Sequence, residues 1–243
     1  MRVENVIQTT LKKMATESHI SINGHTHVLY KENALSQQEL IKQSEEFYRL
    51  LDERRSVREY ADTPVPKEVI ETLIKTASTA PSGAHKQPWT FCAVSNPILK
   101  TKIREAAEAE EKESYESRMS DRWLKDLEPM GTNMYKPFLE DAPWLIIIFK
   151  KVHNLDTNGE KVKNYYVNES VGIAAGMLIT AIHNAGLVTL THTPSPMNFL
   201  AKLLGRPSNE RAFLLLPVGY PKTPTYVPDI ERKSLDEVSK FYE

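Results

Sequence analysis

One helix limits the possible folds of this chain more than any other segment. Residues 166–184 are apolar almost all round a helix, and Gly186 follows as a typical C-cap. A helix of this kind is buried against other elements, because it offers water no polar face. Its small residues, Gly172, Ala174, Ala175 and Gly176, allow close helix approach. We therefore expect a buried helix with tightly packed neighbours.

Strand candidates alternate with helices in the rest of the chain. Apolar and partly β-branched runs predict strands at 89–94, 144–149, 187–191 and 213–218. Helix starts are indicated by a capping box at 36–39, by Pro66 and by Asn96 followed by Pro97. Prolines punctuate the residues from 221 onward, which we expect to form an extended tail. The pattern predicts a single α and β domain without giving the order of its strands.

Length and composition set the outer limits. The chain has 243 residues, of which 40% are hydrophobic, enough for one sizeable core. Residues 1–34 are polar and weakly patterned, so we expect a flexible N-terminal arm ahead of a domain at 35–243. A net charge of −1 does not favour a nucleic-acid partner, which would require a basic face.

Cysteine usage and hydropathy bear on the compartment. The single cysteine, Cys92, excludes an intrachain disulfide and lies in an apolar run, where we expect it to be buried. The most apolar stretch, 171–182, is shorter than the roughly 20 residues of a membrane span. The N-terminus carries no signal-peptide pattern. We expect a cytoplasmic protein with no membrane partner.

A dense arginine cluster is the first candidate site. Arg54, Arg55 and Arg58 lie within five residues, with Ser56 between them. Guanidinium groups match phosphate oxygens in a bidentate way, and a serine hydroxyl adds a donor. The cluster is therefore a plausible phosphate site. An ordinary solvated helix end, where arginines also favour the macrodipole, stays open as the alternative.

Several common motifs do not occur in the sequence. The nine glycines form no G-x-G-x-x-G and no Walker A pattern, which disfavours Rossmann and P-loop folds. The seven histidines form no H-E-x-x-H pair and no zinc spacing, so we expect no metal site. A G-x-S-x-G nucleophile elbow is also absent.

Glu111, Tyr115 and Lys136 form a second candidate site. Glu111 and Tyr115 are four residues apart and share one helix face, and Lys136 follows further on. A carboxylate and an ammonium that converge would suit a zwitterionic amino acid. The alternative is an ordinary charged helix face.

Together these segments resemble the nitroreductase superfamily and, within it, the iodotyrosine deiodinase family. The resemblance spans roughly residues 36–240 and begins with Arg54-Arg55-Ser56-Val57-Arg58. It continues through residues 80–85, 88–91, 165–166, 169–171, 184–188, 191–194, 203–207, 216–221, 227–229 and 232–233. The insertion at about 108–137, which holds Glu111, Tyr115 and Lys136, points to the deiodinases. The resemblance implies an α+β fold, in which helices flank a mixed sheet, and an intertwined homodimer with FMN at the subunit interface.

The resemblance also assigns roles to individual residues. It places the FMN phosphate and ribityl chain against Arg54, Arg55, Ser56, Val57, Arg58 and Arg232. It places the flavin ring near Thr191, His192 and Thr193, and near Pro81, Ser82 and Gly83 of the other subunit. It makes Ala84 a backbone N–H donor to a substrate phenolate and places the Thr193 hydroxyl near flavin N5. Glu111, Tyr115 and Lys136 would grip the amino and carboxyl groups and close a lid.

The implied activity is FMN-dependent reductive dehalogenation of halotyrosines, converting iodotyrosine to tyrosine and iodide. An external electron donor or reductase, linked to NADP, would supply the electrons. His192 and residues 195–198 are more similar to bacterial or invertebrate members than to vertebrate ones. Two alternatives stay open: an FMN-dependent nitro or quinone reductase on the same scaffold, and a flavin-loaded halotyrosine sensor without turnover.

Overall fold

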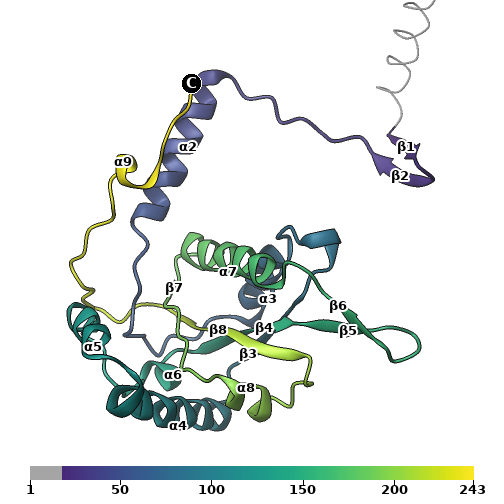
Figure 1. Ribbon diagram of the computed structural model, residues 1–243. Coiled ribbons are helices and arrows are strands. Elements are labelled where there is room, and N and C mark those ends of the chain that lie inside the picture. Colours follow the sequence, from purple (N-terminus) through teal and green to yellow (C-terminus); the bar gives the residue numbers. More distant parts are fainter. Residues whose placement is uncertain (1–17) are drawn as a thin grey trace, which may run out of the picture. The chain divides into compact units, whose positions relative to one another are not determined.

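The computed structural model describes residues 18–243 (Figure 1). The chain divides into two compact units, residues up to Arg49 and Leu50–Glu243, and each is described by itself. Residues 1–17 of the predicted flexible arm lie outside the described residues, and the predicted domain start at residue 35 stays a prediction. Within the described part of the chain, no helix combines the length and apolarity needed to cross a membrane.

The first unit contains a hairpin that the sequence analysis missed. β1 (His19–Ile22) pairs antiparallel with β2 (His25–Val28). Asn23 and Gly24 connect them with φ angles of 50° and 80°, as a two-residue hairpin turn requires. The Asn-Gly pair was the signal available in the sequence. α2 (Gln37–Asp52) begins at the predicted capping box, where the Ser36 N–H donates to Glu39 Oε2 at 2.8 Å.

A four-stranded antiparallel sheet organises the second unit. Its order is β3 (Trp89–Val94), β4 (Trp144–Lys151), β8 (Glu210–Gly219) and β7 (Val188–Thr189). At the β7 edge, Ser56 forms an isolated parallel bridge with Thr189, so the parallel pairing expected of a mixed sheet is limited to this bridge. All four predicted strands are present, although their lengths differ.

The differences in strand length have local causes. β8 begins at Glu210, three residues before the predicted strand at 213–218. Glu210 can be buried at the start of the strand because its carboxylate is paired. Its oxygens accept hydrogen bonds from Arg206 Nε and Thr90 Oγ1, each at 2.7 Å. β7 is shorter than predicted, and regular pairing after Thr189 resumes only at the isolated bridge between His192 and Leu215.

β4 separates two hydrophobic cores. Alternate side chains of a strand point to opposite faces, and the five residues 145–149 are all 0% exposed. Ile146 and Ile148 pack with α3 (Lys67–Ser78) and α7 (Val167–Asn184). Leu145, Ile147 and Phe149 pack with α4 (Pro97–Glu113), α6 (Phe138–Asp141) and α8 (Asn198–Leu203). Helices therefore flank the sheet on both faces (Figure 1).

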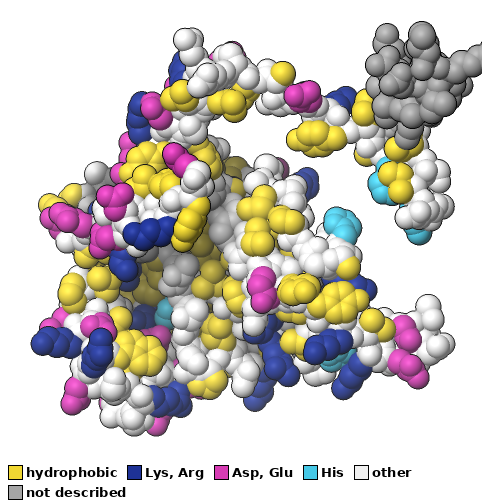
Figure 2. All heavy atoms as spheres, turned by 45° about the horizontal axis from the view of Figure 1, so that its top comes forward, with side chains coloured by type: hydrophobic (Ala, Val, Ile, Leu, Met, Phe, Trp, Pro, Cys, Tyr) yellow, Lys and Arg dark blue, Asp and Glu magenta, His cyan; other side chains and the backbone are white. Residues whose placement is uncertain are grey.

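α7 is covered on one side only. Val171, Ala174 and Leu178 are buried in the first core, whereas Gly172 and Gly176 are exposed, with no atom near an added Cβ. Ile173, on the same open side, is 46% exposed. Hydrophobic side chains are also exposed elsewhere on the face drawn in Figure 2. The expectation of a helix buried on most sides is therefore not met within a single chain.

Shorter elements complete the second unit. They are η1 (Gly83–His85), η2 (Ser114–Arg118), α5 (Asp121–Leu127), η3 (Glu128–Met130), β5 (His153–Leu155), β6 (Lys161–Lys163) and α9 (Leu235–Val238). β5 and β6 form a projecting hairpin that was not predicted (Figure 1). α4 begins as predicted, since Asn96 Oδ1 accepts the Leu99 N–H at 3.0 Å. The C-terminal segment is mostly extended, as predicted, apart from the single turn of α9.

A buried lysine joins α4 to the end of α6. Lys100 is 8% exposed, and its Nζ donates to the carbonyl oxygens of Glu140 and Ala142, each at 2.7 Å. Lys100→Met should lower the free energy of unfolding by about 2–4 kcal/mol. It removes two charge-assisted hydrogen bonds and leaves the two carbonyl oxygens without their donor. Urea denaturation measures the loss, with Lys102→Met at an exposed position as the control. Equal stability of the two variants would contradict this role.

Candidate active site

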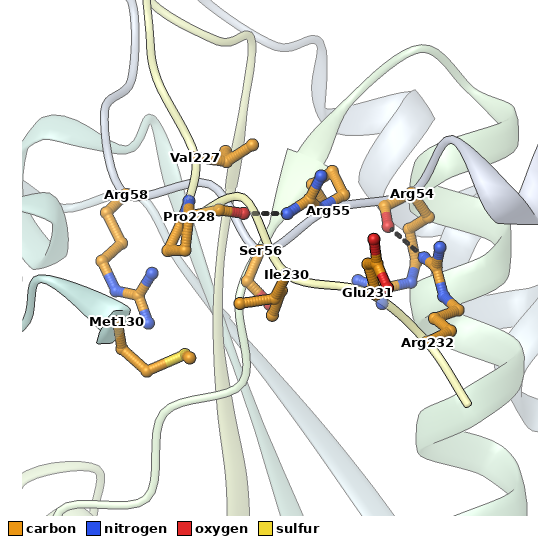
Figure 3. Close-up of a pocket in the computed structure, with 10 residues that line it drawn as sticks. All are labelled: Arg54, Arg55, Ser56, Arg58, Met130, Val227, Pro228, Ile230, Glu231 and Arg232. Carbon is orange, nitrogen blue, oxygen red and sulfur yellow. Dashed lines mark hydrogen bonds between the residues drawn. The ribbon is translucent and has the colours of Figure 1, made fainter. Parts of the chain in front are cut away.

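Four arginines converge on a cavity of about 170 Å³ (Figure 3). Arg54, Arg55 and Arg58 come from the segment after α2, and Arg232 comes from the C-terminal segment. Arg232 Nη2 donates to the Arg54 carbonyl at 2.9 Å, and its Nη1 lies 2.8 Å from Asp52 Oδ1. Arg55 donates to the Pro228 carbonyl. These bonds hold two segments together that are far apart in the sequence.

The cavity is built for an anion. Its lining comprises Arg54, Arg55, Ser56, Arg58, Met130, Val227, Pro228, Ile230, Glu231 and Arg232. Burial, together with the charges of Arg232 and Arg55, lowers the pKa of the Arg54 guanidinium below its usual value. Guanidinium groups crowded in this way are stabilised by a ligand with several negatively charged oxygens. A phosphate group fits that requirement.

Val57 does not line this cavity, although it was predicted with the cofactor group. Its side chain is 5% exposed, and its N–H donates to the Thr189 carbonyl at 3.3 Å. The alternation along an extended segment turns Val57 into the protein, whereas Ser56 and Arg58 face the cavity. Val57 therefore ties the arginine segment to β7.

A strained loop follows α3. Ala84, His85 and Gln87 have φ angles of 49°, 53° and 46°, a left-handed conformation that is uncommon for residues with a side chain. The Ser82 hydroxyl accepts the Gln87 N–H at 2.9 Å, and the Ser82 carbonyl accepts the His85 N–H at 3.0 Å. Gln87 Nε2 also lies 2.9 Å from His85 Nε2. These hydrogen bonds hold the backbone of the loop in place.

The same loop presents one free backbone donor. Among residues 18–243 the Ala84 N–H has no hydrogen-bond partner. A Cβ on Gly83 would lie 2.9 Å from Tyr166 Cδ2, so only glycine allows this close packing. Backbone strain of this kind is found most often at functional sites. Pro81, Ser82, Gly83 and Ala84 do not line the arginine cavity of their own chain.

Two threonines face outward beside the edge of the sheet. His192 pairs with Leu215, its N–H donating at 2.9 Å and its carbonyl accepting at 3.0 Å. The flanking Thr191 and Thr193 are exposed, and their hydroxyls make no hydrogen bond to any described residue. Both hydroxyls are therefore free to contact a ligand.

The His192 side chain points the other way. It is 6% exposed and meets the Phe138 ring edge-on, with ring centroids 5.5 Å apart. Burial, with smaller effects of Lys136 and Arg58, lowers the pKa of His192 to about 3, so the imidazole is neutral. Its Nε2 has no partner among the described residues. A ligand that lies against Thr191 and Thr193 would therefore meet the backbone of His192.

Glu111, Tyr115 and Lys136 come together, as the resemblance implied. Lys136 Nζ lies 3.3 Å from Glu111 Oε2 and 5.7 Å from the centre of the Tyr115 ring. The Lys136 and Glu111 side chains are only 5% and 12% exposed. Burial lowers the pKa of Lys136, and the charge of Glu111 opposes that shift. The three residues form a closed, charged cluster.

Glu108 supports this cluster and was not predicted. Its Oε1 accepts the backbone N–H of Lys136 at 2.7 Å, and its other oxygen pairs with Arg104. The signal in the sequence was its place three residues before Glu111, on the same helix face. Met130 was also missed. It lines the arginine cavity and belongs to the lid segment, residues 108–137.

Known proteins are similar to this chain throughout the second unit. The model of the Nitroreductase family matches residues 51–220. The iodotyrosine deiodinase of Haliscomenobacter hydrossis is 59% identical over 205 residues, covering 84% of this chain and 92% of that protein. Iodotyrosine deiodinase 1 of Homo sapiens is 49% identical over 213 residues, covering 87% and 74%.

A solved structure agrees with these relatives. The crystal structure of oxidized iodotyrosine deiodinase bound to FMN and 3-iodo-L-tyrosine superposes with a TM-score of 0.69. It is 33% identical and covers 78% of this chain and 96% of its own. The family model matches more than half of the chain, and the relatives share about half or more of their residues with it, which establishes common ancestry. The chain belongs to the nitroreductase family and, within it, to the iodotyrosine deiodinases.

Proposed function

We propose that this chain catalyses FMN-dependent reductive dehalogenation of halotyrosines, with iodotyrosine converted to tyrosine and iodide. The observation that carries the proposal is the closed cluster of Glu111, Tyr115 and Lys136. A carboxylate and an ammonium that pair with each other can also pair with the two charged groups of an amino acid. The deiodinases that are 59% and 49% identical to this chain support the same substrate class.

The arginine cavity fits the phosphate group of FMN. Arg54, Arg55, Arg58 and Arg232 offer guanidinium donors to its phosphate, and Ser56 adds a hydroxyl. The free hydroxyls of Thr191 and Thr193 are available to the flavin ring. When bound, FMN supplies the two electrons that, with one proton, replace the carbon–halogen bond by a carbon–hydrogen bond and release halide. An external electron donor, which we propose to be NADP-linked, would restore them.

Ala84 provides the contact to the phenol end of the substrate. Iodine next to a phenol oxygen lowers the pKa of the phenol, so part of the substrate arrives as phenolate. The Ala84 N–H has no partner within residues 18–243, and the bonds of Ser82 hold it in place. A fixed donor of this kind stabilises a negatively charged oxygen.

We further propose a cytoplasmic homodimer. The open side of α7 carries Gly172, Ile173 and Gly176, where nothing lies within 4 Å of a Cβ added at either glycine and Ile173 is 46% exposed. The Ala84 loop does not line the arginine cavity of its own chain. Pairing of two copies would cover α7 and bring the loop of one protomer to the cofactor of the other. Sedimentation of the purified protein tests this arrangement, and an FMN-loaded monomer would contradict it.

Anaerobic single turnover tests the proposed reaction. Reduced protein is mixed with 3-iodotyrosine, and flavin absorbance, tyrosine and iodide are followed. We expect one tyrosine and one iodide for each flavin that is reoxidised. Faster oxidation by nitroaromatics than by iodotyrosine would favour the nitro or quinone reductase. Tight binding without iodide release would favour the sensor.

The arginine cavity gives a prediction for cofactor affinity. Arg55→Ala should weaken FMN binding by about tenfold or more, because a hydrogen bond from a charged group contributes about 1.5–3 kcal/mol. Flavin fluorescence on titration of the apoprotein measures the change. Arg49→Ala removes an exposed arginine of α2 and is the control. Wild-type FMN affinity in the Arg55 variant would exclude the phosphate assignment.

Thr193 gives a prediction for the chemistry. Thr193→Ala should keep FMN and halotyrosine affinity but slow iodide release about five- to tenfold. A hydroxyl can donate or accept beside the reacting edge of the flavin, and one such bond contributes about 1 kcal/mol or somewhat more. Single-turnover rates measure the effect, and Thr193→Ser should restore them. A wild-type rate of iodide release in the Thr193→Ala variant would show that the Thr193 hydroxyl does not control the reaction.

A further inference from the structure

A wide helical turn in the lid segment sets the direction of Arg118. α4 runs on into η2, a π-turn in which the Met119 N–H donates to the Ser114 carbonyl at 2.9 Å. In a regular α-helix, Arg118 would be rotated about 80° away from Glu110, which lies eight residues earlier. The π-turn holds one extra residue, which brings both side chains onto one face. Arg118 Nη1 donates to Glu110 Oε2 at 2.9 Å.

The same nitrogen of Arg118 also bonds a second segment. Nη1 donates to the backbone carbonyl of Ser195 at 3.0 Å, across 77 residues of sequence. Ser195 lies two residues after Thr193, so this bond joins the lid segment to the segment that carries the Thr193 hydroxyl. Arg118 does not line the arginine cavity. Any effect of Arg118 on a ligand in that cavity must therefore pass through other residues.

The backbone between Arg118's partner and Thr193 has little freedom. Pro194 is buried, and its ring fixes its own φ at about −65°. A proline also restricts the residue before it, here Thr193, to an extended conformation. On the other side of Thr193, two backbone hydrogen bonds hold His192 to β8. The direction of the Thr193 hydroxyl therefore depends on where the Ser195 carbonyl is held.

We propose that Arg118 is a positioning residue for Thr193. Its bond to the Ser195 carbonyl fixes one end of a stiff segment, and the bridge of His192 fixes the other. The inference rests on the proposed function, in which the Thr193 hydroxyl lies beside the reacting edge of the flavin. It adds the residue of the lid segment that holds this hydroxyl in its direction.

The exposure of Arg118 makes it suitable for substitution. The side chains of Arg118 and Glu110 are 44% and 28% exposed. Pairs that water can reach contribute little to the stability of a protein. Arg118→Ala should therefore fold, and its effects can be separated from those of a general destabilisation of the lid segment.

The reduction potential of the bound FMN tests the proposal without turnover. A hydrogen bond at the edge of a flavin tunes its electronics, so losing the bond shifts the potential. The potential is measured on the FMN-loaded protein with saturating 3-fluorotyrosine, whose strong carbon–fluorine bond resists reduction. We expect Thr193→Ala and Arg118→Ala to shift the potential in the same direction. The double variant should show no shift beyond that of Thr193→Ala, because residues that act through one contact are not additive.

Two further variants complete this experiment. Glu110→Ala removes the carboxylate that directs Arg118 but leaves both partners of the Ser195 bond in place, so it should give a smaller shift of the same sign. Arg122→Ala removes an exposed arginine of α5, in the same lid segment, and is the control that should keep the wild-type potential. A wild-type potential in Arg118→Ala, or shifts that add in the double variant, would overturn the proposal.

The rate of iodide release gives a second readout. Arg118→Ala should slow single-turnover release about two- to fivefold, which is part of the loss expected for Thr193→Ala. The dissociation constant of 3-iodotyrosine should stay within about twofold of wild type, because the bond concerns the direction of a hydroxyl. In the Thr193→Ala background, the same change should leave the rate unaltered. A large loss of affinity with an unchanged rate would show that Arg118 only stabilises the lid segment.

These outcomes separate the inference from the proposed function. If the potentials follow the expected order but wild-type protein releases no iodide, the role of Arg118 stands and the proposed reaction fails. If iodide is released and Thr193→Ala shifts the potential while Arg118→Ala does not, the reaction stands and the role of Arg118 fails.

Discussion

The burial of β4 on both faces is the constraint on which the rest of the second unit depends. Five consecutive apolar residues, 145–149, divide their side chains between two cores. One core carries α3 and α7, and with them the loop that presents Ala84. The other carries α4 and α6, which bracket the lid segment. β8, next to β4, aligns the segment of Thr191 and Thr193 through the bridge of His192 to Leu215. Three of the four groups of site residues are thus positioned from one strand.

The lid segment is held by charges more than by apolar contacts. Arg104, Glu108 and Glu140 form a network at its base, and the pair of Lys136 and Glu111 lies beside this network. Phe138, just beyond the segment, is its nearest large buried side chain. Ion pairs are directional and can be exchanged, whereas apolar packing cannot be transferred to a ligand.

Much of the fold was predictable because its signals are local. The strand at 89–94 and the helix starts at Ser36 and Asn96 follow from short apolar runs and capping residues, and the structure has them where they were predicted. Buried charges were not predictable, because Lys100 and Glu210 are stabilised by partners far away in the sequence. The β5–β6 hairpin was missed for a different reason, since its strands have only three residues each and are mostly polar.

The candidate site was predictable in part. The arginine cluster is contiguous, but its meeting with Arg232 depends on the path of the C-terminal segment and followed only from the resemblance. The resemblance assigned Val57 and His192 to the cofactor site without indicating where their side chains point. In the structure both side chains point into the protein, between neighbours that point outward. The left-handed backbone of Ala84 has no sequence signal, because alanine rarely adopts it.

The strain in the Ala84 loop divides recognition into two physically different halves. The energy that keeps Ala84, His85 and Gln87 left-handed is spent during folding, before any ligand arrives. Under the proposed function, a phenol oxygen would meet a donor that is already ordered, so binding would cost no loop entropy. The amino-acid end would meet Lys136 and Glu111, which pair with each other at 3.3 Å. Differences among ring substituents should thus appear mainly as differences in contact energy, whereas differences at the amino-acid end should also carry the cost of rearrangement.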